Sequence, residues 1–256
     1  INIQQKLYII EFNVIKIDAS VRHELFSFLK LVESLSQFSE SIGIRWFNIA
    51  FDLLEASEKN SKHATYLAYE ILKRHSQSFI NLIVANDSEV NPIATLEAVR
   101  LVSKVSRLSW NGFDNFRLGI SVNPATETPF FPFSYSDERD LSYSVAVELT
   151  QPLLDIIKSN SGKDLELLRD KVINDISPIV HSIEENALSI GDELGSAYKG
   201  QDISLAPYPD SKISVIKALH LLGLKDIGEN GTMFFTAYLT SILKRILKNT
   251  GVRAVG

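Results

Sequence analysis

The chain has 256 residues, of which 45% are hydrophobic, and its formal net charge is −5. A chain of this length buries roughly three quarters of its unfolded surface, and one α/β domain over 1–256 is the simplest prediction. The absence of a basic block excludes the usual nucleic-acid-binding surface, and no apolar run reaches the ~20 residues of a membrane span.

Cysteine is absent from the sequence. Disulfide scaffolds, thiolate metal sites and thiol nucleophiles are therefore excluded, and a cytoplasmic location is the default prediction. The segment 1–17 lacks the charged lead and the cleavage site of a signal peptide. Met233 is the only methionine, so Ile1 is not a natural start, and we expect the natural chain to continue past one or both ends.

The first half of the chain alternates between strand-like and helix-like segments. β-rich segments predict strands over 7–17, 44–51, 78–86 and 115–123, and amphipathic patterns predict helices over 20–41, 57–75 and 92–105. Ser20 provides an N-cap for the first of these helices, and Pro92 stands in the first turn of the third. This alternation favours an α/β fold with largely parallel strands.

The second half is more helical. It predicts strands over 141–149 and 201–206, and helices that begin at Thr150 or cover 163–194, 211–223 and 230–248. Pro178 should kink or break the helix over 163–194. The acidic run at 182–195, which includes Glu184, is typical of a solvated helix face.

Polar side chains recur on the predicted strands, although buried parallel strands are usually apolar on both faces. One face of strand 115–123 carries Arg117, Gly119, Ser121 and Asn123. The recurrence predicts that strands 115–123, 141–149 and 201–206 are neighbours in one sheet or barrel and line a cavity. The alternative is that these are edge strands that face solvent.

Two acids, Glu148 and Asp202, stand at or near the ends of these strands. They are suited to act as a general acid/base pair or as ligands of a hard metal, and Asn123 and Ser204 would bind a ligand beside them. The alternative is a salt bridge to Arg117 or Arg139. None of the five histidines has a ligand spacing, so no metal-binding residue is assigned.

The loop 126–136 is rich in proline and phenylalanine. Pro129 and Pro132 each fix a backbone angle, so Phe130 and Phe131 are held in a fixed place. The two phenylalanines either cover a cavity or plug the end of a barrel as part of its core.

The segment GENGT, 228–232, opens the helix over 230–248. Gly231 leaves the backbone accessible, and Thr232 adds a hydroxyl group to first-turn amides that attract anions. This predicts a site for an anionic small molecule such as a phosphate or a carboxylate. The alternative is an ordinary capped helix.

Several motifs in order carry a resemblance to a known family. The loop TPFFP (128–132), the strand end DISLAP (202–207) and the pair Gly231-Thr232 resemble the uncharacterised proteins of domain-of-unknown-function family 711, over roughly 110–248. The resemblance implies an α/β barrel of about ten strands, similar to the pyruvate formate-lyase group. It implies no activity, and the absence of cysteine excludes glycyl-radical chemistry.

Two functions remain open. The first is binding of an anionic small molecule, or non-radical catalysis, in the barrel cavity, with no cofactor assigned. The second is a structural role, in which helices 20–41 and 231–248 form the interface of a homo-oligomer. The segment MFFTAYLTSIL, 233–243, supports the second because it is apolar around most of the helix.

Overall fold

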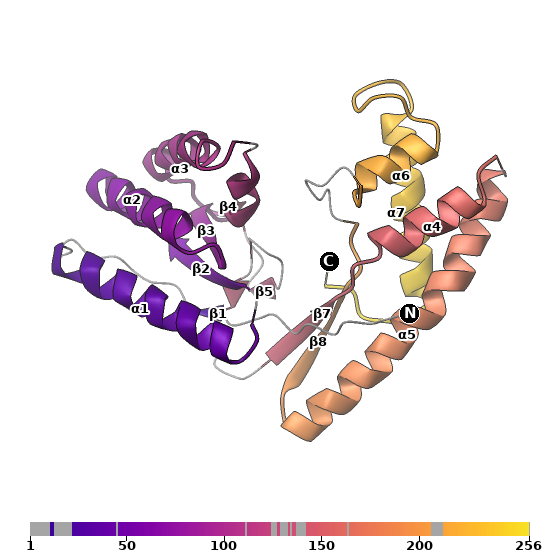
Figure 1. Cartoon of the computed structure of the whole chain (residues 1–256), viewed down its shortest axis with the longest axis horizontal. Coiled ribbons are helices and arrows are strands. Elements are labelled where there is room, and N and C mark those ends of the chain that lie inside the picture. The colour runs from indigo at the N-terminus through magenta and orange to yellow at the C-terminus, as the bar shows by residue number, and fades with distance from the viewer. Residues whose placement is uncertain are drawn as a thin grey trace. The chain divides into compact units, whose positions relative to one another are not determined.

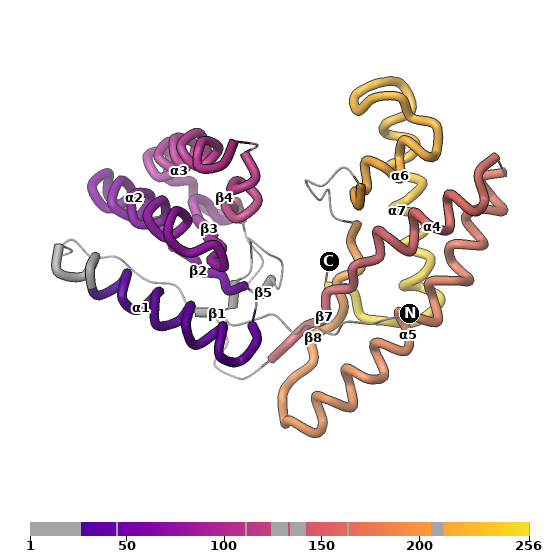
Figure 2. The backbone as a smooth tube through the Cα atoms, viewed as in Figure 1, coloured from indigo at the N-terminus to yellow at the C-terminus, as the bar shows by residue number. Residues whose placement is uncertain are grey.

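The computed structural model of the chain describes residues 11–12, 22–44, 46–110, 112–123, 127–128, 133, 135–136, 142–162, 164–205 and 212–255. The chain divides into two compact units, Ile1–Arg139 and Asp140–Gly256, here called unit 1 and unit 2. Figure 2 traces both units through their Cα atoms. That they belong to a single α/β domain stays a prediction.

Unit 1 alternates strands and helices (Figure 1). Its elements are β1 (Glu11–Phe12), α1 (Arg22–Ser41), β2 (Phe47–Asp52), α2 (Glu58–Arg74), β3 (Ser78–Ala85), α3 (Pro92–Val105), the 3₁₀ helix η1 (Phe113–Arg117), β4 (Leu118–Val122), β5 (Glu127–Thr128) and β6 (Tyr135–Ser136). The helices predicted over 20–41, 57–75 and 92–105 are confirmed to within two residues at each end.

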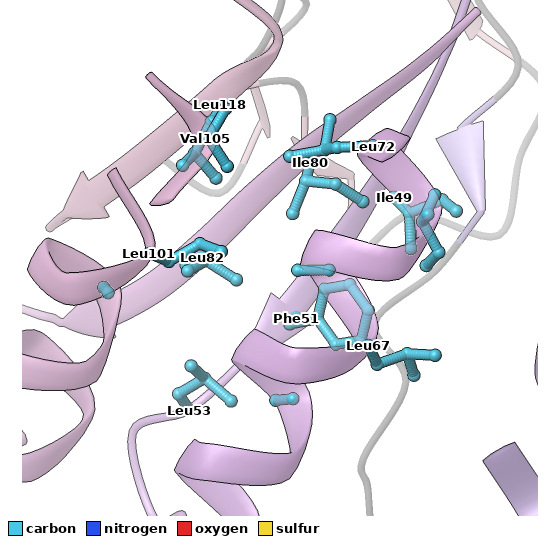
Figure 3. Packing of buried hydrophobic residues seen from close by; sticks show 14 of the residues in the cluster. Ile49, Phe51, Leu53, Leu67, Leu72, Ile80, Leu82, Leu101, Val105 and Leu118 are labelled. Carbon is cyan, nitrogen blue, oxygen red and sulfur yellow. The ribbon is translucent and has the colours of Figure 1, made fainter. Parts of the chain in front are cut away.

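The strands β1, β2, β3 and β4 form one parallel sheet in that order. Because each strand pairs with the next one along the chain, right-handed crossovers place the intervening helices on the same face of the sheet. Alternate strand residues on that face build the core, which Figure 3 shows from close by. The core includes Phe47, Ile49 and Phe51 of β2, Ile80, Leu82 and Val84 of β3, and Leu67, Leu72, Leu101 and Val105 of the helices.

The second face of this sheet carries aromatic and polar side chains. The rings of Trp46, Phe79 and Phe116 have centroids between 5.3 and 6.3 Å apart. Ser121 Oγ donates a hydrogen bond of 2.7 Å to Asn81 Oδ1 on the neighbouring strand, and both side chains are buried. The polar position at Ser121 is therefore satisfied inside unit 1.

In the residues that the structure describes, unit 2 combines a pair of strands with four helices (Figure 1). Its elements are β7 (Ser142–Ala146), α4 (Thr150–Ser159), α5 (Leu165–Leu194), β8 (Ala197–Asp202), α6 (Val215–Leu221) and α7 (Thr232–Thr250). The predicted break at Pro178 does not occur, since α5 continues through it. The helices share a second core, which includes Leu154 of α4, Ile176 of α5, Leu219 of α6 and Ile242 of α7.

β7 and β8 run parallel, and residues 253–255 pair along the other edge of β8. Gln201 N donates to Arg253 O over 2.8 Å, and Val255 N donates to Gln201 O over 2.9 Å. The register of the β7–β8 pair shifts where Tyr143 pairs with Tyr198 but Ser144 pairs with Gly200. One residue of β8 is therefore extra, which makes a β-bulge.

The predicted barrel of about ten strands is wrong. In the part of the chain that the structure describes, the strands form a four-stranded sheet and two separate pairs, and they do not close. The prediction that strand 115–123 neighbours 141–149 and 201–206 is wrong as well, because β4 pairs with β3. Of the polar residues that suggested a common cavity, Ser121 instead bonds to Asn81 within the sheet of unit 1.

Among the helices that the structure describes, none has the length and apolarity that crossing a membrane would require.

Candidate functional site

The two predicted acids lie at the same end of the β7–β8 pair. Ala146 pairs with Asp202, and Val147 N donates to Asp202 O over 2.8 Å, so Glu148 follows directly beyond the paired end of β7. Asp202 is half-buried, and its Oδ1 accepts a hydrogen bond of 2.8 Å from Ser204 N, whereas Glu148 is exposed. The structure therefore brings Glu148, Asp202 and Ser204 to the C-terminal end of the β7–β8 pair. Their role as an acid/base pair with a ligand-binding serine stays a prediction.

Asn123 belongs to unit 1 and follows the end of β4. Its φ is 52°, in the left-handed region that asparagine tolerates better than most residues. Its backbone N donates to Ala85 O over 2.9 Å, and its side chain is exposed. A ligand-binding role for Asn123 stays a prediction.

Arg117, a predicted alternative partner of Glu148 or Asp202, forms an ion pair within unit 1. Its Nη2 lies 2.6 Å from Asp114 Oδ1, three residues earlier in η1, and the guanidinium is buried in unit 1. Arg139, the other predicted partner, lies outside the described residues. The described residues contain no group of three or more His, Asp or Glu side chains that could hold a metal ion.

Gly231 and Thr232 stand at the start of α7. Gly231 has a φ of 103°, which only glycine adopts readily. Thr232 Oγ1 accepts from Gly228 N over 3.1 Å and donates to Glu229 O over 2.8 Å. The hydroxyl group is therefore engaged in the turn before the helix, and anion binding by this turn stays a prediction.

The predicted cavity loop, Pro129, Phe130, Phe131 and Pro132, lies outside the described residues. Its role in covering a cavity or plugging a core stays a prediction.

Sequence reasoning missed a half-buried polar cluster between α5 and β8. Glu184 Oε2 accepts hydrogen bonds from Tyr198 Oη over 2.5 Å and from Gln201 Nε2 over 2.9 Å. Gln201 is fully buried, and its Nε2 also donates to Val180 O over 2.8 Å. The prediction of a solvated helix face is therefore wrong for Glu184. Residues on one face of a regular strand are two positions apart. Tyr198 and Gln201 are three apart, and the β-bulge between them lets both contact α5, so a search for alternating residues does not find this cluster.

We expect the Tyr198 hydroxyl to make unit 2 sensitive to high pH. Burial first, and then the hydrogen bond to the Glu184 carboxylate, raise the pKa of Tyr198 above its ordinary value of 10.0. A pKa raised by folding stabilises the folded state below the unfolded pKa, and this contribution is lost as the pH rises toward the folded pKa. The unfolding free energy should therefore fall from about pH 10 upward.

Tyr198→Phe should flatten that alkaline fall, measured by urea unfolding from about pH 8 to about pH 11. Tyr66→Phe, at an exposed tyrosine of α2 in unit 1, is the matched control. Its unfolding free energy should fall with pH at the same slope as that of the wild-type chain. Equal slopes for wild type and Tyr198→Phe would contradict the prediction.

The exposed side of α7 carries a groove with a volume of about 310 Å³, here called the α7 groove. It is lined by Met233, Thr236, Ala237, Thr240, Ser241 and Lys244. The hydroxyl groups of the lining donate hydrogen bonds to backbone carbonyls of the same helix. Thr236 Oγ1 donates to Thr232 O, Thr240 Oγ1 to Thr236 O, and Ser241 Oγ to Tyr238 O. The middle of the α7 groove therefore presents small side chains, and the protons of their hydroxyl groups are already in hydrogen bonds.

The opposite side of α7 belongs to the core of unit 2. Tyr238, Leu239, Ile242 and Ile246 are buried there, and Tyr238 Oη donates to Leu165 O over 2.6 Å. This anchoring fixes which side of the helix is exposed. Met233 and Phe234 are 82% and 57% exposed at its first turn, so the exposed side of α7 is apolar there, whereas Thr236, Thr240 and Lys244 make the rest of that side more polar.

Comparison with protein families gives a match over nearly the whole chain. The family model described as Uncharacterised ACR (DUF711) matches residues 2–255. The chain belongs to this family. The resemblance identified from TPFFP, DISLAP and Gly231-Thr232 is thereby confirmed.

Curated relatives of this DUF711 chain are all named as UPF0210 proteins. The protein of Pyrobaculum arsenaticum is 28% identical over 152 residues, which are 59% of this chain and 34% of the relative. The protein of Oenococcus oeni is 23% identical over 237 residues, 88% of this chain and 50% of the relative. The chain thus spans about a third to a half of the length of the relatives it matches. The family is uncharacterised, and its names assign no activity.

Proposed function

We propose that this chain is an assembly protein that associates with a second copy of itself through the α7 groove. The observation that carries the proposal is the apolar first turn on the exposed side of α7, where Met233 and Phe234 are 82% and 57% exposed. Contiguous exposed apolar surface on a soluble domain marks sites of protein interaction. The engaged hydroxyl groups of the groove favour packing against another helix over binding of a polar ligand.

The charges at the two ends of α7 support a second copy as the partner. Asp226 and Glu229 precede the helix and outnumber Lys225 at that end, whereas Lys244, Arg245 and Lys248 stand in its last turns, and all six are exposed. When two such helices run antiparallel, the acidic end of each meets the basic end of the other, and the helix dipoles also oppose favourably. A surface that complements itself in this way meets the requirement of an isologous dimer.

A second candidate function is binding or non-radical turnover of a small molecule at the edge of β7 and β8. It is supported by the common position of Glu148, Asp202 and Ser204 at that edge. Binding of an anion at Gly231 and Thr232 belongs to the same candidate. The assembly proposal has the stronger support because Met233 and Phe234 are exposed on α7 and the charges at the two ends of the helix select a partner.

Ala237→Arg should dissociate the assembled chain into single chains. The substitution places a long charged side chain in the middle of the groove, where a second helix would have to desolvate it. Sedimentation velocity over a range of protein concentrations measures the change. Ala237 is exposed, so the fold tolerates the longer side chain.

Ser189→Arg, at a small exposed residue of α5, is the matched control and should leave the assembly intact. The proposal fails if the wild-type chain sediments as a single chain at every concentration, or if Ala237→Arg sediments like an assembled wild type. The small-molecule candidate would then be the better supported one.

A further inference from the structure

We infer that the two copies pair with their α7 helices antiparallel, about a two-fold axis at the level between Tyr238 and Leu239. The inference rests on the proposed self-association and adds the orientation and the register of the pair. It follows from three features of α7: the symmetry of the groove lining, the size of the residues in its middle, and the charges at its ends.

The lining of the α7 groove is symmetric about the level between Tyr238 and Leu239. Each lining residue before this level has a counterpart the same number of residues after it: Met233 with Lys244, Thr236 with Ser241, and Ala237 with Thr240. A two-fold axis between antiparallel helices places every residue opposite its counterpart on the other copy. In this register the whole groove of one copy therefore meets the whole groove of the other.

Small residues occupy the middle of the groove, where the helices would be closest. Thr236, Ala237, Thr240 and Ser241 let two helix axes approach toward the lower end of the usual range of about 8–10 Å. The longer side chains stand at the two ends, where Met233 of one copy can pack along the aliphatic stem of Lys244 of the other. The shape of the α7 groove is thus complementary to that of a second copy. The register is the one that the symmetric positions of the lining residues give.

The charged residues beyond the groove select the antiparallel orientation. Lys248 stands one turn beyond Lys244, the last residue of the groove lining, and Glu229 stands in the turn before α7. An antiparallel pair therefore brings Lys248 of each copy to the end of the other helix that follows Glu229. A parallel pair would set Lys244 and Lys248 of the two copies side by side, which like-charge repulsion disfavours.

The absence of native cysteine allows a direct test of the register. The single-cysteine variants Ala237→Cys and Thr240→Cys are oxidised separately and as a mixture. Equal positions on the two copies are offset by three residues, about 4.5 Å along the axis, whereas 237 and 240 lie opposite each other. The mixture should therefore give a disulfide between 237 and 240 in about five-fold or greater excess over either like pair, because the bond demands a close Cα distance.

A charge exchange tests the ends of the pair. Glu229→Lys alone should weaken the association, since it sets two lysines together at each end, and Glu229→Lys with Lys248→Glu should restore it. Failure of the double variant to recover association would overturn the inferred register.

The results separate the inference from the proposed function. Preferential linkage of 237 to 240 with recovery by the charge exchange supports both. Predominant linkage of like positions in a chain that Ala237→Arg dissociates overturns the antiparallel register but keeps assembly through α7. A wild-type chain that stays single, together with cysteine variants that give no linkage, overturns both.

Discussion

Arg117→Leu should lower the free energy of unfolding of unit 1 by about 3–5 kcal/mol. Arg117 is 6% exposed, and its guanidinium donates to four oxygens. Nη2 donates over 2.6 Å to both Leu72 O and Asp114 Oδ1, and Nη1 donates to His75 O over 2.8 Å and to Ser78 O over 3.1 Å. Leucine would leave these buried acceptors, and the carboxylate of Asp114, without a donor.

The position of these acceptors explains why the cost is large. Leu72 and His75 belong to the C-terminal end of α2, where helix carbonyls lack partners within the helix, and Ser78 begins β3. Arg117 therefore joins the end of α2 to the start of β3 and to η1. Its loss removes a connection between three elements in addition to an ion pair with Asp114.

Tryptophan fluorescence during urea unfolding measures this change, because both tryptophans, Trp46 and Trp110, lie in unit 1. Lys62→Leu is the matched control: Lys62 pairs with Glu58 on the exposed surface of α2, and its loss should cost much less than the loss of Arg117. A similar small cost for Arg117→Leu would show that the buried guanidinium adds nothing beyond a surface ion pair.

The local elements of unit 1 could be predicted because their signals are local. Asn91 precedes Pro92, and it caps α3 by accepting from Ile93 N and Ala94 N. The same side chain donates to the carbonyls of Leu53, Leu54 and Ala56 over 2.8 to 3.0 Å. The sequence predicts the start of the helix, but only the folded chain shows that Asn91 also holds the segment after β2.

Local signals could not predict whether the strands close into a barrel. They also could not predict which partners the polar residues bind. Arg117 and Ser121 share an alternating pattern with Gly119, which indicates a polar strand face. In the structure Arg117 belongs to η1 and its side chain is directed to α2, while Ser121 bonds within the sheet. The pattern was read as one surface, although its members satisfy partners about 40 residues away that periodicity does not reveal.

β8 shows a different limit. The prediction placed a strand over 201–206, whereas the strand covers Ala197–Asp202. The sequence AYKGQD contains no β-branched residue and includes a glycine, so propensity does not favour a strand there. Pairing with β7 on one side and with residues 253–255 on the other imposes the extended conformation.

Gly200→Ala should lower the free energy of unfolding of unit 2 by about 3–5 kcal/mol, through backbone strain and overpacking. Gly200 has a φ of 133°, and a Cβ atom there would lie 2.5 Å from Arg253 O and 3.0 Å from Val255 Cγ1. Because the first of these atoms belongs to the backbone, residues 253–255 must move away from β8. The bonds between Gln201 and the backbone of Arg253 and Val255 would be lost with them.

Gly195→Ala separates the close approach from the strain of a positive φ. Gly195 has a φ of 61° at the end of α5, and a Cβ atom there would meet nothing within 4 Å, so this variant should cost only about 1–2 kcal/mol. Urea unfolding followed by far-ultraviolet circular dichroism gives the cost of each variant, and hydrogen exchange of the Gln201 and Val255 amides reports on the pairing. Protection of both amides should fall in Gly200→Ala and persist in Gly195→Ala. Equal costs, with both amides still protected in Gly200→Ala, would mean that the bulge tolerates a side chain and that glycine is not required for residues 253–255 to pair with β8.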